Sequence, residues 1–176
     1  MTRKLVIASG ALVIFISLVL NLPIYAVVDN AAKQTISTNI NGFAFTNDGC
    51  CPDVSTNLSG EMIIDTDGTM KLSSQSGSIT IGSTDYKLEF MPTDKMTEEI
   101  VSNGCSSNPT YTQDGEINMV GNNGIVIKGS GTYSWGTFPS CSDDKHSFTN
   151  FSGKMLDPSG QPIEFYTGTD SLPIIQ

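Results

Sequence analysis

His146 is the only histidine of the chain, so a Ser-His-Asp arrangement would have to be built around it. Asp143 and Asp144 lie close to it in sequence. The glycine-framed serine of a nucleophile elbow is missing from the sequence, and a lone histidine in a polar loop is most often solvated. We therefore expect no catalytic residue and no cofactor.

Four aspartates form a weak candidate cation site: Asp48, Asp53, Asp143 and Asp144. Each lies near a cysteine in sequence, and carboxylate oxygens are the ligands that hard cations prefer. The spacing of a calcium loop is matched only in part, at Asp65-Thr66-Asp67-Gly68, where a hairpin turn accounts for the residues fully. A zinc site would need C-x-x-C pairs or further histidines. We expect no metal as a structural component.

The chain has four cysteines, Cys50, Cys51, Cys105 and Cys141. An even number of cysteines in an exported chain favours disulfides over free thiols. A bridge between neighbouring residues departs from the usual Cα separation. We therefore predict that Cys50 and Cys51 each bond to one of Cys105 and Cys141, in either order.

The formal net charge is −9, and the only arginine is Arg3. Nucleic acid binding needs clustered basic side chains, so we expect no nucleic acid partner. Arg3 and Lys4 precede a long apolar run, which makes residues 1–26 a signal peptide or an uncleaved membrane anchor. Both alternatives place the protein outside the cell or on its surface, and contact with a membrane is expected only through this segment.

Apolar and polar residues alternate over most of the remaining chain, which predicts antiparallel strands. Mid-strand glycines on the apolar face indicate a sharply curled sheet. We predict an all-β up-and-down meander closed or nearly closed into a small barrel, with a two-sheet β-sandwich as the alternative. The expected divisions are a linker at 27–35, one β domain at 36–170 and a tail at 171–176. The nine expected strands are 36–46, 55–64, 69–74, 78–82, 85–91, 115–120, 124–135, 147–156 and 162–167.

One short helix is expected near 93–103, because Thr93 or Asp94 is a good N-cap and Asn103-Gly104 a good helix end. Counting nine strands also places every cysteine-bearing connection at the same end of the sheet. The four cysteines and the four aspartates would then gather on one rim.

Side chains of both faces of the strands carry further expectations. Asn57 and Asn150 open N-x-S triplets on the outward face and are candidate N-glycosylation sites. Inward-facing residues are candidates for lining a ligand cavity, unless they fill the barrel: Leu58, Met62, Ile127, Tyr133, Trp135, Phe151 and Phe165.

Three functions remain open from the sequence. The leading hypothesis is an exported, disulfide-stabilised, non-catalytic barrel that binds a small apolar ligand, or an extracellular protein or glycan partner, at its cysteine-clamped end. The second is a structural protein of the cell envelope or surface with no ligand. The third is a secreted hydrolase.

Overall fold

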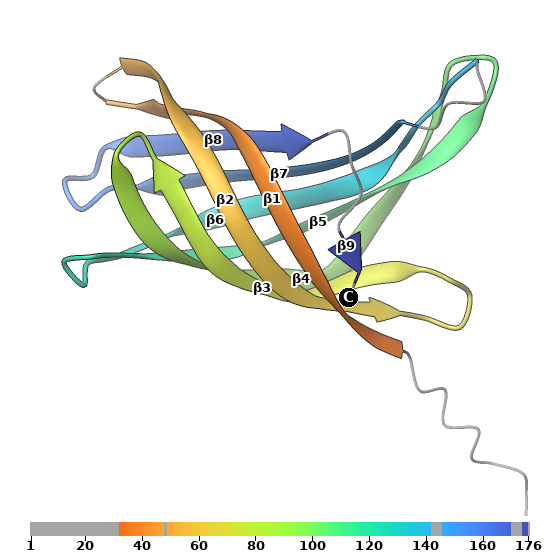
Figure 1. Ribbon diagram of the computed structural model, residues 1–176, viewed down its shortest axis with the longest axis horizontal. Coiled ribbons are helices and arrows are strands. Elements are labelled where there is room, and N and C mark those ends of the chain that lie inside the picture. The colour runs from red at the N-terminus through yellow and green to blue at the C-terminus, as the bar shows by residue number, and fades with distance from the viewer. Residues whose placement is uncertain (1–31, 48, 142–145, 170–173, 176) are drawn as a thin grey trace, which may run out of the picture. The chain divides into compact units, whose positions relative to one another are not determined.

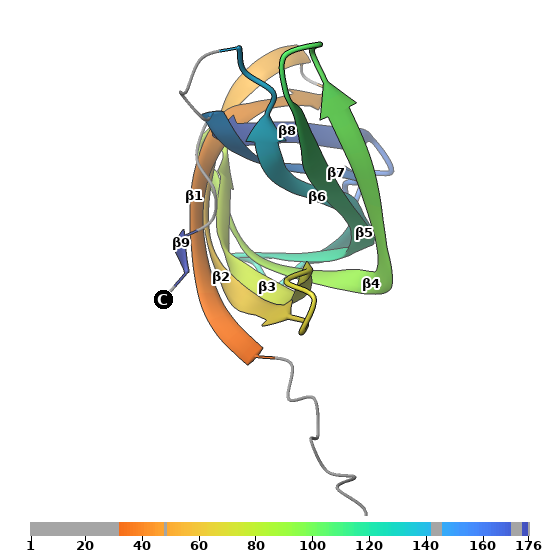
Figure 2. The ribbon, with the colours of Figure 1, turned by 90° about the vertical axis from the view of Figure 1, so that its right-hand side faces the viewer.

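The computed structural model describes residues 32–47, 49–141, 146–169 and 174–175. They form an antiparallel meander in which each of the first eight strands pairs with its neighbours along the chain. The strands are β1 (Ala32–Thr46), β2 (Gly49–Ile64), β3 (Met70–Ile81), β4 (Thr84–Ser102), β5 (Ser107–Gly121), β6 (Val126–Phe138), β7 (His146–Leu156), β8 (Pro162–Thr169) and the short β9 (Ile174–Ile175). Figures 1 and 2 show the strands curling around a common interior.

The sheet closes on itself because β1 pairs with β2 on one side and with β8 on the other. The register of the closing pair sets Ala44 opposite Phe165. Strand β9 pairs with Ile36 and Ser37 of β1. The predicted all-β barrel is therefore confirmed as a closed meander of eight strands, and the sandwich alternative is wrong.

Alternate residues of the long strands point into the barrel, as the period-two pattern predicts. The residues that share this orientation form one buried hydrophobic cluster, which includes Ile36, Leu58, Phe90, Ile117, Trp135, Phe151 and Phe165. Gly131 and Gly153 face each other across β6 and β7 on the inner side. A Cβ at Gly153 would overlap the ring of Phe165 and the end of Ile117, so this glycine makes room for the aromatic core.

The predicted helix near 93–103 is wrong. Residues 84–102 form β4, which pairs with β5 up to its last residue, where Ser102 lies opposite Ser107. The pairing has a bulge between Pro92 and Met96. Asn103 and Gly104 make the hairpin turn, with φ +86° at Gly104, because the residues that end a helix also suit a tight turn. Pairing with β5 satisfies the backbone groups that a helix would have satisfied internally.

The predicted break between strands 69–74 and 78–82 is also wrong, since these residues form the continuous β3. Gly77 lies so close to β2 that a Cβ would overlap the carbonyl oxygen of Asn57. The glycine and serines of this stretch thus serve close strand approach rather than a turn. In addition, β1 begins at Ala32, so residues 32–35 of the predicted linker pair with β2, and residues 174–175 of the predicted tail pair with β1.

Candidate functional site

The seven connections of the meander lie at two opposite ends of the barrel. The cavity end carries the links β1–β2, β3–β4, β5–β6 and β7–β8, and the clamped end carries the links β2–β3, β4–β5 and β6–β7. The sequence predicted two strands where the structure has the single strand β3. One connection fewer therefore precedes Cys105 and Cys141, which moves both cysteines to the opposite end of the barrel from the predicted one. The cysteines therefore do not share a rim: Cys50 and Cys51 start β2 at the cavity end, whereas Cys105 and Cys141 lie at the clamped end.

The disulfide pairing follows this arrangement and differs from the predicted one. Cys105 is bonded to Cys141, and Cys50 is bonded to its neighbour Cys51. Cross-links from Cys50 or Cys51 to the other two cysteines would have to run the length of the barrel. The structure thus has one disulfide, Cys105–Cys141, that joins two loops far apart in sequence, and one, Cys50–Cys51, that joins neighbouring residues.

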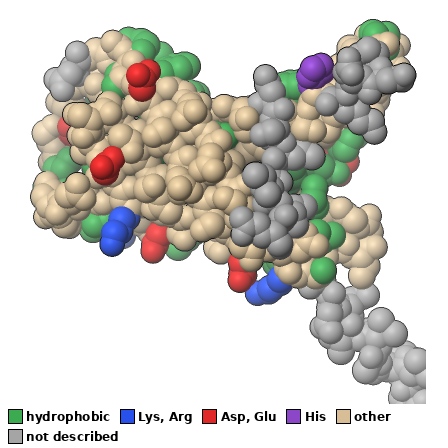
Figure 3. Space-filling view, in the orientation of Figure 1, with side chains coloured by type: hydrophobic (Ala, Val, Ile, Leu, Met, Phe, Trp, Pro, Cys, Tyr) green, Lys and Arg blue, Asp and Glu red, His purple; other side chains and the backbone are tan. Residues whose placement is uncertain are grey.

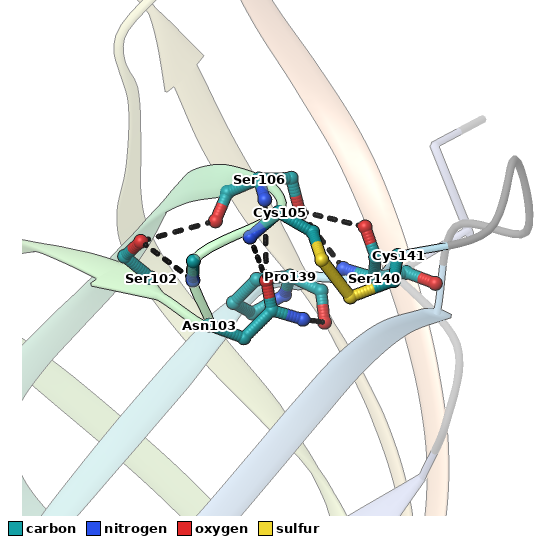
Figure 4. The surroundings of a disulfide bond; sticks show 8 residues. Ser102, Asn103, Cys105, Ser106, Pro139, Ser140 and Cys141 are labelled. Carbon is teal, nitrogen blue, oxygen red and sulfur yellow. Dashed lines mark hydrogen bonds between the residues drawn. A yellow bond between two sulfur atoms is a disulfide. The ribbon is translucent and has the colours of Figure 1, made fainter.

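Hydrogen bonds reinforce the Cys105–Cys141 bridge (Figure 4). The Asn103 side-chain oxygen accepts bonds from the backbone N–H groups of Cys105 and Ser106 at 3.0 and 3.1 Å, and its Nδ2 donates to the Pro139 carbonyl at 3.0 Å. The Ser106 hydroxyl donates to the Ser140 carbonyl and accepts from the Ser140 N–H, at 3.0 and 2.9 Å. The β4–β5 turn and the start of the β6–β7 link are therefore held together by covalent and polar contacts.

Two exposed apolar side chains lie near this bridge. Ile100 is 59% exposed and Phe138 is 45% exposed, and the Phe138 ring stacks on Phe148 with the centroids 4.5 Å apart. Glu98 and Glu99 are exposed on the same stretch of β4. Hydrophobic side chains are visible on the projection at the upper right of Figure 3. The clamped end thus combines a fixed backbone with exposed apolar and acidic groups.

The opposite end contains an open cavity of about 660 Å³. Three nearly buried isoleucines contribute to its wall, Ile81, Ile127 and Ile163. The carboxylate of Asp157 accepts bonds from the Ser159 N–H and hydroxyl and from the Gln161 N–H, and these bonds lower the pKa of Asp157. Asp157 therefore fixes the β7–β8 turn. The remaining lining residues are Thr46, Asn47, Gly49, Cys50, Pro52, Gly82, Ser83, Thr84, Tyr86, Pro158, Ser159, Gln161 and Pro162.

The seven predicted cavity-lining residues are all buried in the core, at 5% exposure or less: Leu58, Met62, Ile127, Tyr133, Trp135, Phe151 and Phe165. Phe151 is the centre of an aromatic cluster, with its ring 5.2 Å from Phe90 and 5.3 Å from Phe165. Of the seven, Ile127 also lines the cavity at the barrel mouth. These side chains pack against one another and fill the part of the barrel in which they lie.

The sequence interpretation overlooked a set of buried polar side chains toward the clamped end. The Tyr133 hydroxyl lies 3.1 Å from the Thr38 hydroxyl, and burial raises the pKa of Tyr133 to about 12. Gln113 is fully buried, and its carboxamide bonds both the N–H and the carbonyl of Leu72 and also the Thr93 carbonyl. Gln113 has the same parity as Ile117 and Met119, so its inward direction was readable from the sequence.

The predicted chemical residues are not brought together among the described parts of the chain. Asp48, Asp143 and Asp144 lie outside the described residues, and Asp53 is exposed at the cavity end. The described residues contain no group of three or more potential metal ligands. His146 is exposed at the start of β7.

Both candidate glycosylation residues, Asn57 in β2 and Asn150 in β7, are exposed on the outer face. The predicted signal or anchor, residues 1–26, lies outside the described residues. Within the part of the chain that is described, no helix is long and apolar enough to cross a bilayer.

Comparison with known proteins gave no matching family, no similar curated protein and no similar solved structure. The fold and the two ends define the chain as a disulfide-bonded β-barrel.

Proposed function

We propose that the protein is an exported, non-catalytic β-barrel module that binds an extracellular protein through its clamped end. The observation that supports this function is the Cys105–Cys141 bridge between two loops, together with the hydrogen bonds of Asn103 and Ser106 across the same junction. Loops that are ordered before binding lose less conformational freedom on association, so more of the contact energy appears as affinity.

The groups beside the bridge suggest the chemistry of the partner. Ile100 and Phe138 are exposed apolar side chains on a fixed backbone, and such residues serve as anchors in protein interfaces. Glu98 and Glu99, which precede Ile100 in β4, add negative charge to the clamped end. The sheet register sets Ile100 and Phe138 on opposite faces of the sheet. We therefore expect a partner that contacts both faces of this end with apolar groups, and that carries basic side chains opposite the glutamates.

Export is supported by the cysteines. All four are in disulfides, and stable disulfides form chiefly in oxidising compartments outside the cytosol. The proposal therefore has three parts: the protein is exported, it binds an extracellular protein, and it does so through the clamped end.

A second candidate function is the binding of a small ligand at the cavity end. It is favoured by the volume of the cavity, about 660 Å³, which lies within the usual range of ligand sites. The lining combines Ile81, Ile127 and Ile163 with a larger number of polar side chains, so the ligand would need polar groups as well as an apolar part. A barrel that binds at neither end would be the structural surface protein that the sequence also allows.

The test is binding of the labelled, oxidised protein to the surface of intact cells of its own source. Ile100→Ser and Phe138→Ser should each weaken binding by about tenfold or more, as expected for anchor residues. Leu156→Ser is the matched control, because Leu156 is as exposed as Ile100, at 59%, but lies at the cavity end. Absence of saturable binding, or an equal loss with Leu156→Ser, would refute the assignment to the clamped end. Native mass spectrometry of the same preparation would reveal a small guest.

A further inference from the structure

The outer face of the barrel has a shallow groove where β1, β8 and β7 lie side by side. Its volume is about 360 Å³, and it is lined by Asn41, Gly42, Phe43, Asn150, Ser152, Tyr166, Thr167 and Gly168. The sheet register places these residues in rows that cross the three strands. Asn41, Gly168 and Asn150 form one row, and Phe43, Tyr166 and Ser152 form the next.

Aromatic rings with large exposed areas border the groove. Phe43 is 42% exposed and Tyr166 is 45% exposed, with ring centroids 5.8 Å apart. Phe45, at 44%, adds a third ring, 5.5 Å from Phe43 and 6.3 Å from Tyr166. A contiguous aromatic patch on the outside of a barrel usually marks a surface that something covers.

The groove also contains both functional residues of an N-glycosylation triplet. Asn150 and Ser152 line it, whereas Phe151 between them points into the core. The side-chain oxygen of Asn150 lies over Gly168, in the space that a Cβ at that position would occupy. The Asn150 carboxamide therefore lies over Gly168 of β8, one row along the strands from Tyr166 and Phe43.

The chemistry of the lining fits an uncharged sugar. None of the eight lining residues carries a charge, and the chain as a whole has a formal net charge of −9, which disfavours anionic ligands. Carboxamides and hydroxyls supply hydrogen-bond donors and acceptors for sugar hydroxyls. The electron-rich faces of Phe43 and Tyr166 suit the C–H groups of a pyranose ring.

We propose that Asn150 is N-glycosylated and that the first sugars of its glycan lie in this groove against Phe43 and Tyr166. In the modification, Asn150 Nδ2 forms a bond to C1 of the reducing-end sugar, and the bond from C1 to the oxygen of a lipid-linked pyrophosphate donor breaks. The lipid pyrophosphate leaves with the electron pair, and Nδ2 gives up one proton. This inference rests on the export that the proposed function includes.

Asn57 provides an internal comparison. It also opens an N-x-S triplet on an exposed strand face, but its cross-strand partners are Asn39 and Ser78. Neither partner is aromatic, so a glycan on Asn57 would have no ring platform beside it. A glycan on Asn150 should therefore stabilise the fold, and one on Asn57 should not.

The experiment is secretion of the full chain from a glycosylating eukaryotic host, followed by glycopeptide mapping and thermal unfolding before and after enzymatic removal of glycans. We expect a glycan on Asn150, and a loss of about 2–4 °C in Tm when it is removed, as for a contribution near 1 kcal/mol in a chain of this size. The loss should persist in Asn57→Gln and disappear in Phe43→Ser/Tyr166→Ser. Enzymatic removal of the glycan converts Asn150 to an aspartate. The Asn150→Asp variant, which carries the same negative charge, shows how much of the change in Tm that charge causes.

An unmodified Asn150, or a loss of Tm that is unchanged in the Phe43→Ser/Tyr166→Ser variant, would overturn the proposal. The two proposals fail separately. A glycan on Asn57 with none on Asn150 would leave export intact and refute only this inference. A stabilising glycan on Asn150 without cell-surface binding would refute only the partner function.

Discussion

Removing the Cys105–Cys141 disulfide should destabilise the barrel strongly, whereas removing Cys50–Cys51 should not. The first bridge joins residues 36 apart in sequence, and the second joins immediate neighbours. For a loop of that length, the chain-entropy model gives a stabilisation of about 4 kcal/mol, because the bridge restricts the unfolded chain. A bridge between neighbours closes no loop of consequence.

The two variants form a matched pair, because all four cysteines are exposed and serine costs little packing at any of them. We expect the free energy of unfolding to fall by about 4 kcal/mol in Cys105→Ser/Cys141→Ser, which corresponds to about 2 M in the urea midpoint. In Cys50→Ser/Cys51→Ser the change should stay within about 0.5 kcal/mol.

The assay is equilibrium urea unfolding followed by the fluorescence of Trp135, the only tryptophan, which is fully buried. Far-UV circular dichroism should give the same midpoint if the transition is two-state. Equal losses in the two variants, or a loss below about 1 kcal/mol for Cys105→Ser/Cys141→Ser, would refute the reasoning that one bridge is a long-range clamp and the other is local.

Three further predictions concern the barrel interior. The pKa of Tyr133 rises from 10.0 to about 12 on folding, so the unfolded chain loses the hydroxyl proton at a lower pH than the folded chain. The free energy of unfolding should therefore fall as pH rises from 10 to 12, by up to about 1.4 kcal/mol per pH unit. Urea unfolding of Tyr133→Phe over the same pH range should lack this part of the decrease. Gly153→Ala should cost about 1–3 kcal/mol because its Cβ overlaps the Phe165 ring, and Phe165→Leu in the same chain should recover part of that loss in urea unfolding. Gln113→Leu should lower the free energy of unfolding by about 3 kcal/mol, since it leaves buried backbone groups of Leu72 unpaired. Gln75→Leu should lower the free energy of unfolding by less, because the Gln75 side-chain oxygen has no hydrogen-bond partner. An equal loss in the two variants would contradict the stabilising role given to the Gln113 hydrogen bonds.

The sequence predicted the fold class because inward and outward positions alternate so regularly. Ile36, Leu58, Ile127 and Phe151 are apolar at inward positions, and each is buried. The mid-strand glycines indicated curvature, and Gly131 and Gly153 do lie on the crowded inner face. These features act over a few residues, and local patterns therefore reveal them.

The errors arose where one local signal fits two structures. Asn103-Gly104 suits both the end of a helix and a hairpin turn, and only pairing with β5 decides between them. The serines and glycine of residues 73–78 suit both a turn and close contact with β2. The second error changed the count of connections by one and so placed all four cysteines on one rim.

The groove on the outer face was beyond local reasoning for a different reason. Phe43 and Tyr166 are far apart in sequence and meet only because β1 closes the sheet against β8. Their outward direction follows from strand parity, but their proximity requires the closing register. The same register brings Asn41 opposite Gly168, with Asn150 on the next strand.

The closure between β1 and β8 is the central claim, because both ends and the outer groove depend on it. Nuclear Overhauser effects between backbone protons of these strands in the oxidised protein test it directly. The structure predicts cross-strand contacts between Phe43 and Tyr166, Ala44 and Phe165, and Phe45 and Glu164. A spectrum that connects β7 to β8 but shows no contact between β8 and β1 would contradict the closed barrel.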